Sequence, residues 1–306
     1  MAIVVAGSLN MDFVVTAARL PAPGETVLGG GFAMLPGGKG ANQACAAGRL
    51  GAGLPVKMIG RVGYDLFADH LKASLAAAGV DVSAVHASRT QPTGVAFICV
   101  EAGGQNSIIV APGANQELGD AGAMRQVFRG ARIALFQLES PLDTVRAALT
   151  IARQEGLVTI LDPAPAQPLG DAILSEVSIL TPNESEALLL VGESPRRLTP
   201  EEAAGVAQAL RAKGADRVIV KLGDAGCLLA DEGRTRLVSG FAVEAVDATA
   251  AGDVFNGALA VALAEGRSLD EAAHFANAAA ALSVTRRGAQ SSVPSRAETD
   301  ALLAGS

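Results

Sequence analysis

RIALFQL at residues 132–138, PLDTVRAALTIARQEG at 141–156 and LVTILDP at 157–163 decide the fold class of this chain. The first and third runs are short and apolar, which is typical of buried strands, and the middle run places apolar residues at helical spacing. A strand, a helix and a second strand in this order predict a βαβ unit with parallel strands.

The same alternation continues toward the C-terminal end. An Ala/Leu-rich helix is expected first, and after it come the strand SILTPN (178–183), the helix EEAAGVAQALRAKG (201–214), the strand DRVIVKLG (216–223), a short hairpin (227–238), the strand-like stretch FAVEAV (241–246) and helices at 253–266 and 269–286. We therefore predict an α/β fold, a doubly wound, mostly parallel sheet with helices on both faces.

Two segments, 10–35 and 93–111, interrupt this alternation. In the second, the alternating runs TGVAFICV and NSIIVAP flank the turn signal AGGQN with no helix between them. We predict that both segments form antiparallel strands of a small β lid, over an α/β domain made of 1–9, 36–92 and 112–306. Exposed lid strands would also offer an edge for self-association.

Composition narrows the function classes. The chain has 306 residues, 50% of them apolar, and a net charge of −7, so a large core is expected and nucleic-acid binding is not.

Three dispersed cysteines, Cys45, Cys99 and Cys227, predict buried thiols in a reducing compartment, with no disulfide framework or thiolate zinc site. No stretch has the length of a membrane span, and no secretory signal is visible, so a cytoplasmic protein is expected. His70, His86 and His274 lack metal-ligand spacing.

The run DATAAGDVFNG at 247–257 carries the strongest functional signal. Small residues at Ala250, Ala251 and Gly252 precede an amphipathic helix, so their N–H groups would form an anion cradle at its positive end. Asp253 stands at the same helix end. Its side chain either caps the helix or takes part in proton transfer, and the run alone leaves both interpretations open.

Other polar residues follow predicted strands or open predicted helices. Ser8, Asn10 and Asp12 follow the first strand, and they suit either a turn or a hydroxylated ligand. In GGKGANQ (37–43), Gly38 would let the backbone approach a sugar while Lys39 and Asn42 donate hydrogen bonds; the spacing is not that of a Walker loop, and a lone Gly-rich loop is weak evidence. Neither site has the dinucleotide fingerprint.

Three further positions lie at strand ends. Glu139 closes a buried strand, where an ionisable group must be paired or functional. Asn183 and Glu186 in TPNESE form a possible capping box, which does not exclude a nucleotide contact. Gly223 and Gly226 bound a turn that could pass close to a triphosphate.

Taken in order and with these intervals, GSLNMD, PGGKGANQA, QLESP, TPNESEA, KLGDAG and DATAAGD resemble the ribokinase family of carbohydrate kinases from about residue 3 to residue 296. The resemblance implies transfer of the γ-phosphate of ATP to the 5-hydroxyl of D-ribose. Asp253 would be the base, and the amides of Ala250, Ala251 and Gly252 would stabilise the transferred group.

The resemblance also implies the ligand contacts. The sugar contacts carried over are Asn10, Asp12, Gly38, Lys39, Asn42, Glu139 and Asp253; the nucleotide contacts are Asn183, Lys221, Gly223, Gly226 and Asn277. Glu186 would organise Mg²⁺ through water. A potassium site is implied at Asp247, Thr249, Ser283, Arg286, Gly288 and Ser292, and a homodimer through the lid strands is implied as well.

Lys221 departs from the family pattern, in which a small hydroxyl residue is usual, so its side chain would contact a phosphate or point to solvent. Two alternatives to a ribose kinase stay open. One is a related kinase for 2-deoxyribose, a nucleoside or another sugar, and the other is a catalytically silent sugar sensor, which would have no need of Asp253.

Overall fold

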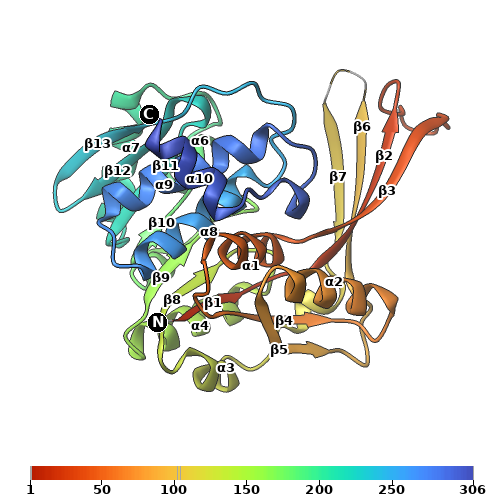
Figure 1. Cartoon of the computed structure of the whole chain (residues 1–306), viewed down its shortest axis with the longest axis horizontal. Helices are drawn as coiled ribbons and strands as arrows, with labels where there is room; N and C mark the ends of the chain where they lie inside the picture. Colours follow the sequence, from red (N-terminus) through yellow and green to blue (C-terminus); the bar gives the residue numbers. More distant parts are fainter. Residues whose placement is uncertain (1, 102, 104, 306) are drawn as a thin grey trace.

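In the computed structural model, which describes residues 2–101, 103 and 105–305, nine strands form a central sheet (Figure 1). Across the sheet they are β13 (Arg234–Ser239), β12 (Gly226–Asp231), β11 (Arg217–Lys221), β10 (Ile179–Leu180), β9 (Val158–Leu161), β8 (Ala131–Phe136), β1 (Ala2–Ala6), β4 (Val56–Val62) and β5 (Val80–Ala87). All neighbouring pairs from β11 to β5 are parallel, whereas β12 and β13 form an antiparallel hairpin at one edge. The predicted doubly wound, mostly parallel sheet is confirmed.

Helices cover both faces of this sheet because alternate residues of each buried strand point to opposite sides. Ile3 and Val5 of β1 pack toward one cluster, and Val4 and Ala6 toward the other. The first cluster includes side chains of α1 (Lys39–Leu50), α2 (Leu66–Ala77), α8 (Ala251–Ala264), α9 (Leu269–Val284) and α10 (Arg296–Ala304). The second includes side chains of α3 (Ala121–Phe128), α4 (Leu142–Gln154), α5 (Asp171–Leu174), α6 (Glu184–Val191) and α7 (Pro200–Ala212).

A separate sheet projects from this three-layer body (Figure 1). In the described residues it has four strands, in the order β3 (Gly29–Gly37), β2 (Asn10–Ala17), β6 (Gly94–Glu101) and β7 (Asn106–Ala111). The β2–β3 and β6–β7 pairs are antiparallel as predicted, but β2 pairs with β6 in parallel, which the sequence did not indicate. Residues 102 and 104 of the predicted turn lie outside the described residues.

Two sequence predictions were wrong. FAVEAV at 241–246 is not a strand: it forms no ladder with a neighbour, and Val246 is more than half exposed. The helix expected between LVTILDP and SILTPN is only the single turn α5, because Pro163, Pro165 and Pro168 occupy the connection and proline disfavours helix interiors.

The prediction of buried thiols is confirmed for Cys45 and Cys227, but Cys99 of the small sheet is only half-buried. Three 3₁₀ turns, η1 (Gly113–Glu117), η2 (Gly223–Ala225) and η3 (Gln290–Ser292), complete the described chain.

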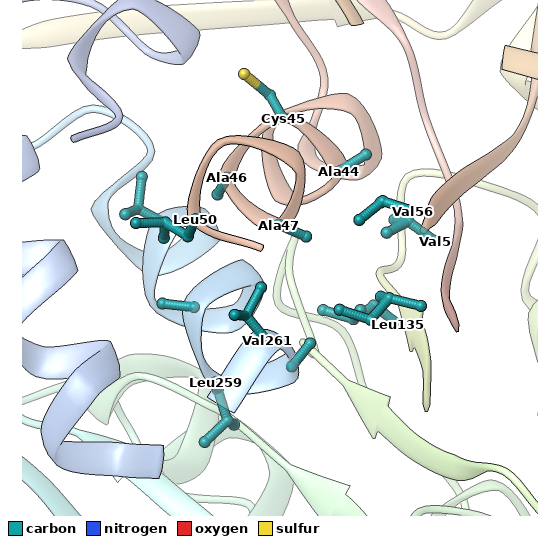
Figure 2. Packing of buried hydrophobic residues seen from close by; sticks show 14 of the residues in the cluster. Val5, Ala44, Cys45, Ala46, Ala47, Leu50, Val56, Leu135, Leu259 and Val261 are labelled. Carbon is teal, nitrogen blue, oxygen red and sulfur yellow. The ribbon is translucent and has the colours of Figure 1, made fainter. Parts of the chain in front are cut away.

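The contact between α1 and α8 fixes the position of the site described below. Ala46 and Ala47 of α1 lie beside α8, where Leu259 and Val261 belong to the same buried cluster (Figure 2). Gly257 of α8 has no side chain to hold the helices apart, and a Cβ built there would lie 2.6 Å from the Ala46 Cβ. The first turns of both helices are therefore brought together at one edge of the sheet.

Candidate functional site

Polar side chains gather at the carboxyl ends of the parallel strands, the edge at which open α/β sheets bind ligands. Asn10 and Asp12 follow β1, Glu139 follows β8, and Asp162 comes directly after β9. Lys221 is the last residue of β11. The first turns of α1 and α8 lie at these strand ends, where Gln43 of α1 donates to both Asp162 and Asp253.

Asp253 lies in the first turn of α8 and is almost completely buried. Its carboxylate accepts a hydrogen bond from Asn42 Nδ2 at 3.0 Å and another from Gln43 Nε2 at 3.1 Å. Burial raises the pKa of Asp253 to about 6, although the ammonium of Lys39 opposes this shift. A carboxyl with a pKa close to neutrality can both accept and release a proton at working pH.

The loop before Asp253 supplies backbone donors. Ala250 is the N-cap of α8 and adopts the left-handed conformation, with φ of 58°. Ala251 N–H makes a long bond of 3.3 Å to Ala248 O, and Gly252 N–H has no acceptor among the described residues. Unbonded N–H groups at a helix start attract anions. Asp253 does not cap the helix through its side chain, so the capping interpretation is wrong.

Lys39 and Glu139 are in contact, and the Lys39 ammonium also interacts with the Asp253 carboxylate. Glu139 accepts hydrogen bonds from the Lys39 backbone N–H at 3.0 Å and from the Ser8 hydroxyl. Burial disfavours the charge of the Lys39 ammonium, but nearby carboxylates, with Asp253 the strongest, more than reverse this effect and hold the pKa of Lys39 above its usual value. Lys39 is therefore a charged group inside the site.

Asn10 and Asp12 lie at the start of β2, where the small sheet leaves the main body. Asn10 Oδ1 accepts a hydrogen bond from Asn115 Nδ2 at 2.7 Å, which leaves the Asn10 amide group as a donor. Burial, helped by the charges of Glu139 and Asp253, raises the pKa of Asp12 to about 7. These side chains can exchange hydrogen bonds with a hydroxylated ligand.

Two glycines let the backbone come close beside these groups. A Cβ on Gly38, whose φ is 89°, would lie 2.7 Å from Asn10 N, and a Cβ on Gly37 would meet the Asp12 carboxylate. Asn42 Oδ1 is buried and has no hydrogen-bond partner in the described part of the chain. A buried acceptor without a partner is costly unless water or a ligand donates to it, so Asn42 Oδ1 is a candidate acceptor for a ligand hydroxyl.

The predicted nucleotide residues lie along β11 and the start of α6. Asn183 and Glu186 form the predicted capping box, with Glu186 N–H donating to Asn183 Oδ1 at 2.9 Å, and Asn183 also bridges in parallel to Lys221. Burial raises the pKa of the Glu186 carboxyl, whereas Lys221 opposes this change. Gly223 and Gly226 bound η2 with φ of 60° and 96°. Asn277 Nδ2 instead donates to the carbonyls of Val238 and Ser239.

Lys221 points into the site and not to solvent. Its Nζ donates to Asp162 Oδ1 at 2.9 Å, and only 14% of its side chain is exposed. A Cβ built on Gly252 would lie 3.2 Å from the same Nζ, so the ammonium sits beside the backbone donors of the α8 loop.

The residues carried over for a potassium site come together only in part. Asp247 accepts hydrogen bonds from Thr249 N–H and hydroxyl and from Gly288 N–H at 2.8 Å, which joins the loop before α8 to the turn after α9. Ser283 and Ser292 donate to neighbouring carbonyls, and the Arg286 guanidinium pairs with Glu298. A carboxylate fits a hard cation in donor chemistry, but Arg286 could contribute only its backbone carbonyl. No cluster of three or more His, Cys, Asp or Glu able to hold a metal exists among residues 2–101, 103 and 105–305.

Sequence reasoning missed several polar residues of the site. Asp162 bonds to both Lys221 and Gln43, Gln137 Nε2 donates to Gln43 Oε1 at 2.6 Å, and Asn115 holds Asn10. Ser8, which the sequence did indicate, donates to Glu139. Gln43 stands within the Gly-rich motif and Asp162 ends the strand LVTILDP, so their positions at a helix start and a strand end were available signals.

The chain matches the family model described as pfkB family carbohydrate kinase over residues 2–296. It is 43% identical to the ribokinase of Haemophilus influenzae over 300 residues, which covers 96% of each chain. Among solved structures it is similar to the ribokinase of Thermotoga maritima, with 40% identity and a TM-score of 0.88, and to the Arabidopsis thaliana ribokinase complexed with ribose and ATP, with 35% identity and a TM-score of 0.91; each alignment covers 99% of both chains. This chain therefore belongs to the pfkB family of carbohydrate kinases.

Proposed function

We propose that this chain is an ATP-dependent ribokinase, which phosphorylates the 5-hydroxyl of D-ribose and releases D-ribose 5-phosphate and ADP. The observation that carries the proposal is the buried carboxylate of Asp253, held by Asn42 and Gln43 at the mouth of the α8 amide cradle. Relatives with this fold over almost their whole length are ribokinases, and one is solved with ribose and ATP.

The arrangement suits transfer in one step. Asp253 accepts the proton of the 5-hydroxyl as the sugar oxygen forms a bond to the γ-phosphorus, and the bond to the bridging oxygen breaks with its electron pair passing to ADP. The amides of Ala250, Ala251 and Gly252 stabilise charge on the transferred group, since positioning and charge stabilisation supply most of the barrier reduction in phosphoryl transfer.

The sugar would be held from the carboxyl ends of β1 and β8. Asn10, Asp12 and Lys39 offer hydrogen-bonding groups to ring hydroxyls, Asn42 offers its unpartnered oxygen, Gly38 admits the sugar by its lack of a side chain, and Glu139 fixes the Lys39 backbone. A site that pairs adjacent hydroxyls discriminates against sugars that lack one, because the protein groups would then stay unpaired.

ATP would lie across the carboxyl ends of β10 and β11. Asn183, Lys221, Gly223 and Gly226 are near one another there through the Asn183–Lys221 bridge and the η2 turn, and Asn277 supports the neighbouring β13. Bound Mg²⁺ neutralises phosphate charge during transfer, and the buried Glu186 would hold it through water.

A potassium ion near Asp247, Thr249 and Gly288 would stiffen the loop that makes the cradle, with backbone oxygens around Ser283, Arg286 and Ser292 as further ligands. The hydrogen bond between Asp247 and Gly288 supports a shared site on these two loops.

The small sheet is proposed as a lid over the sugar and as a homodimer contact. Its exposed apolar residues support the second role: Phe32, Met34, Phe97 and Ile109 are each at least half exposed.

The binding partners proposed for this chain are small molecules, neither nucleic acid nor membrane. No helix in the described part of the chain is long and apolar enough to cross a bilayer. Free buried thiols at Cys45 and Cys227 support a reducing compartment, the cytoplasm.

The test is coupled ATP turnover with D-ribose, 2-deoxyribose, D-fructose and adenosine, with Mg²⁺ present and K⁺ supplied or replaced by a bulky organic cation. We expect turnover with D-ribose above the other acceptors, and a rise with K⁺. Turnover only with another acceptor would replace the ribose assignment while keeping the reaction, and turnover with none would favour a silent sensor.

A further inference from the structure

Lys221 and Asp162 form an ion pair inside the site. The proposal above places Lys221 near ATP but gives the pair no part in the transfer step. Their side chains are 14% and 3% exposed, and the Nζ–Oδ1 distance is 2.9 Å. A nearly buried ion pair is weak evidence for stability, because desolvation of both charges offsets their attraction. Its position therefore calls for a functional reason.

The Lys221 ammonium lies beside the α8 loop that is proposed to hold the transferred group. Lys221 Nζ would be 3.2 Å from a Cβ on Gly252, the residue whose unbonded N–H opens the proposed cradle. Gly252 has no side chain, so none of its own atoms occupies the space between its Cα and the ammonium. An anion seated on the loop would meet Lys221 directly.

The acidic groups of the site outnumber its ammonium groups. Among the described residues, the interacting carboxyl groups are those of Asp12, Glu139, Asp162, Glu186 and Asp253, and the ammonium groups are those of Lys39 and Lys221. Lys39 is held on the sugar side by its place at the start of α1, next to Glu139. Lys221 is the lysine on the phosphate side.

Asp162 holds Lys221 in this place and is itself held. Asp162 Oδ2 accepts a hydrogen bond from Gln43 Nε2 at 3.0 Å, and the same nitrogen donates to Asp253 at 3.1 Å. Gln137 fixes the orientation of the Gln43 amide by donating to its Oε1. The phosphate-side lysine and the base are thus positioned by one connected set of buried groups.

We propose that Lys221 is a catalytic residue whose ammonium contacts the transferred phosphoryl group, and that Asp162 is the positioning residue that holds it beside the α8 loop. The proposal rests on the proposed phosphoryl transfer but not on the identity of the sugar. A fixed positive charge at the transferred group stabilises the transition state more than the bound substrate, so it acts on kcat.

The experiment compares Lys221→Met, Asp162→Asn and the double variant by steady-state kinetics. Lys221→Met is expected to lower kcat by about a hundredfold, in the range for removal of one preorganised donor, with the KM for D-ribose within about threefold. Asp162→Asn is expected to lower kcat about tenfold. The double variant leaves no buried unpaired charge and should be no slower than Lys221→Met. An asparagine at position 162 can still accept from Gln43 Nε2 through its amide oxygen, so this change acts through the lost pairing with Lys221.

A second readout needs no acceptor. Tetrafluoroaluminate with ADP and Mg²⁺ mimics the transferred group, and calorimetry measures how much it tightens ADP binding. We expect this tightening in the wild-type protein and at least a tenfold smaller one in Lys221→Met, with the affinity for ADP alone unchanged. Lys57 and Asp81 form an exposed ion pair at the amino end of the sheet, so Lys57→Met and Asp81→Asn are matched controls that should leave every value unchanged.

A kcat of Lys221→Met within threefold of wild type, or an undiminished tightening, would overturn the role of Lys221. Losses that add in the double variant would overturn the positioning role of Asp162. If the wild-type protein acts on another acceptor, the ribose assignment fails but the same variants are assayed with that acceptor. If the wild-type protein acts on no acceptor, the calorimetric comparison of wild type with Lys221→Met alone decides whether Lys221 contacts the transferred group.

Discussion

Gly257 of α8 lies against α1 so closely that a Cβ built on it would be 2.6 Å from Ala46 Cβ and 2.7 Å from Gln43 O. Gly257 is one helical turn after Asp253, and Gln43 is one of the two residues that donate to the Asp253 carboxylate. The spacing of the two helices therefore sets the distance between the base and its donors.

Gly257→Ala should separate α1 from α8 and lower both stability and turnover. The extra methyl group overpacks the contact, which costs about 1–3 kcal/mol, and it moves Gln43 away from Asp253. Urea unfolding and kcat measure the two effects. Gly205→Ala in α7 is the control, since a Cβ there meets nothing within 4 Å; it should stabilise the protein by about 0.4–1 kcal/mol at unchanged kcat. Equal behaviour of the two variants would contradict the helix-spacing argument.

Asp253→Asn should reduce kcat by a factor on the order of 10²–10⁴ while D-ribose binding stays nearly intact. The amide keeps the shape of the side chain but cannot take the hydroxyl proton. Calorimetric titration with D-ribose and coupled turnover measure the two quantities. Loss of binding together with turnover would mean that Asp253 mainly holds the site together.

Turnover should fall as the pH drops below about 6. The pKa of Asp253 is raised to about 6 by burial, so acidification protonates the base and removes the proton acceptor, whereas kcat should be flat well above that pH. Rates at saturating substrates between pH 5 and 8 give the profile. Lys39 lowers the pKa of Asp253, so Lys39→Met should move the acidic limb to higher pH. A kcat that stays constant down to pH 5 would exclude Asp253 as the titrating base.

Ile109→Glu should reduce self-association if the small sheet is a dimer contact. Ile109 pairs with Phe97 across β7 and β6, and both side chains are at least half exposed. A charge on this apolar face disfavours its burial. Sedimentation velocity gives the mass, with Leu237→Glu on the exposed β13 as the control. An unchanged dimer in Ile109→Glu would place the contact elsewhere.

Local patterns predicted the fold better than they predicted contacts. Periodicity and strand-end position are short-range properties, so LVTILDP and EEAAGVAQALRAKG indicated β9 and α7 correctly. FAVEAV failed because a strand also requires a neighbour with free backbone groups, which no local pattern reports. The parallel pairing of β2 with β6 joins segments about 80 residues apart in the chain, and nothing in either segment specifies it.

The same limit applies to the site. The motif GGKGANQ indicated that Asn42 belongs to a ligand loop, but its bond to Asp253 spans 211 positions and depends on the α1–α8 contact. Asp162 was missed because an aspartate before a proline at a strand end is typical of a turn. Only the folded chain shows that Lys221 is its partner.

The main sheet and the small sheet are continuous through a very short segment. β1 ends at Ala6 and β2 begins at Asn10, so only Gly7, Ser8 and Leu9 separate them. Any rigid displacement of the small sheet must carry Asn10 and Asp12 with it. With the proposed sugar contacts at Asn10 and Asp12, the affinity for the sugar depends on the position of the small sheet. By reciprocity, any partner that binds one position of that sheet in preference to another would change the affinity for the sugar.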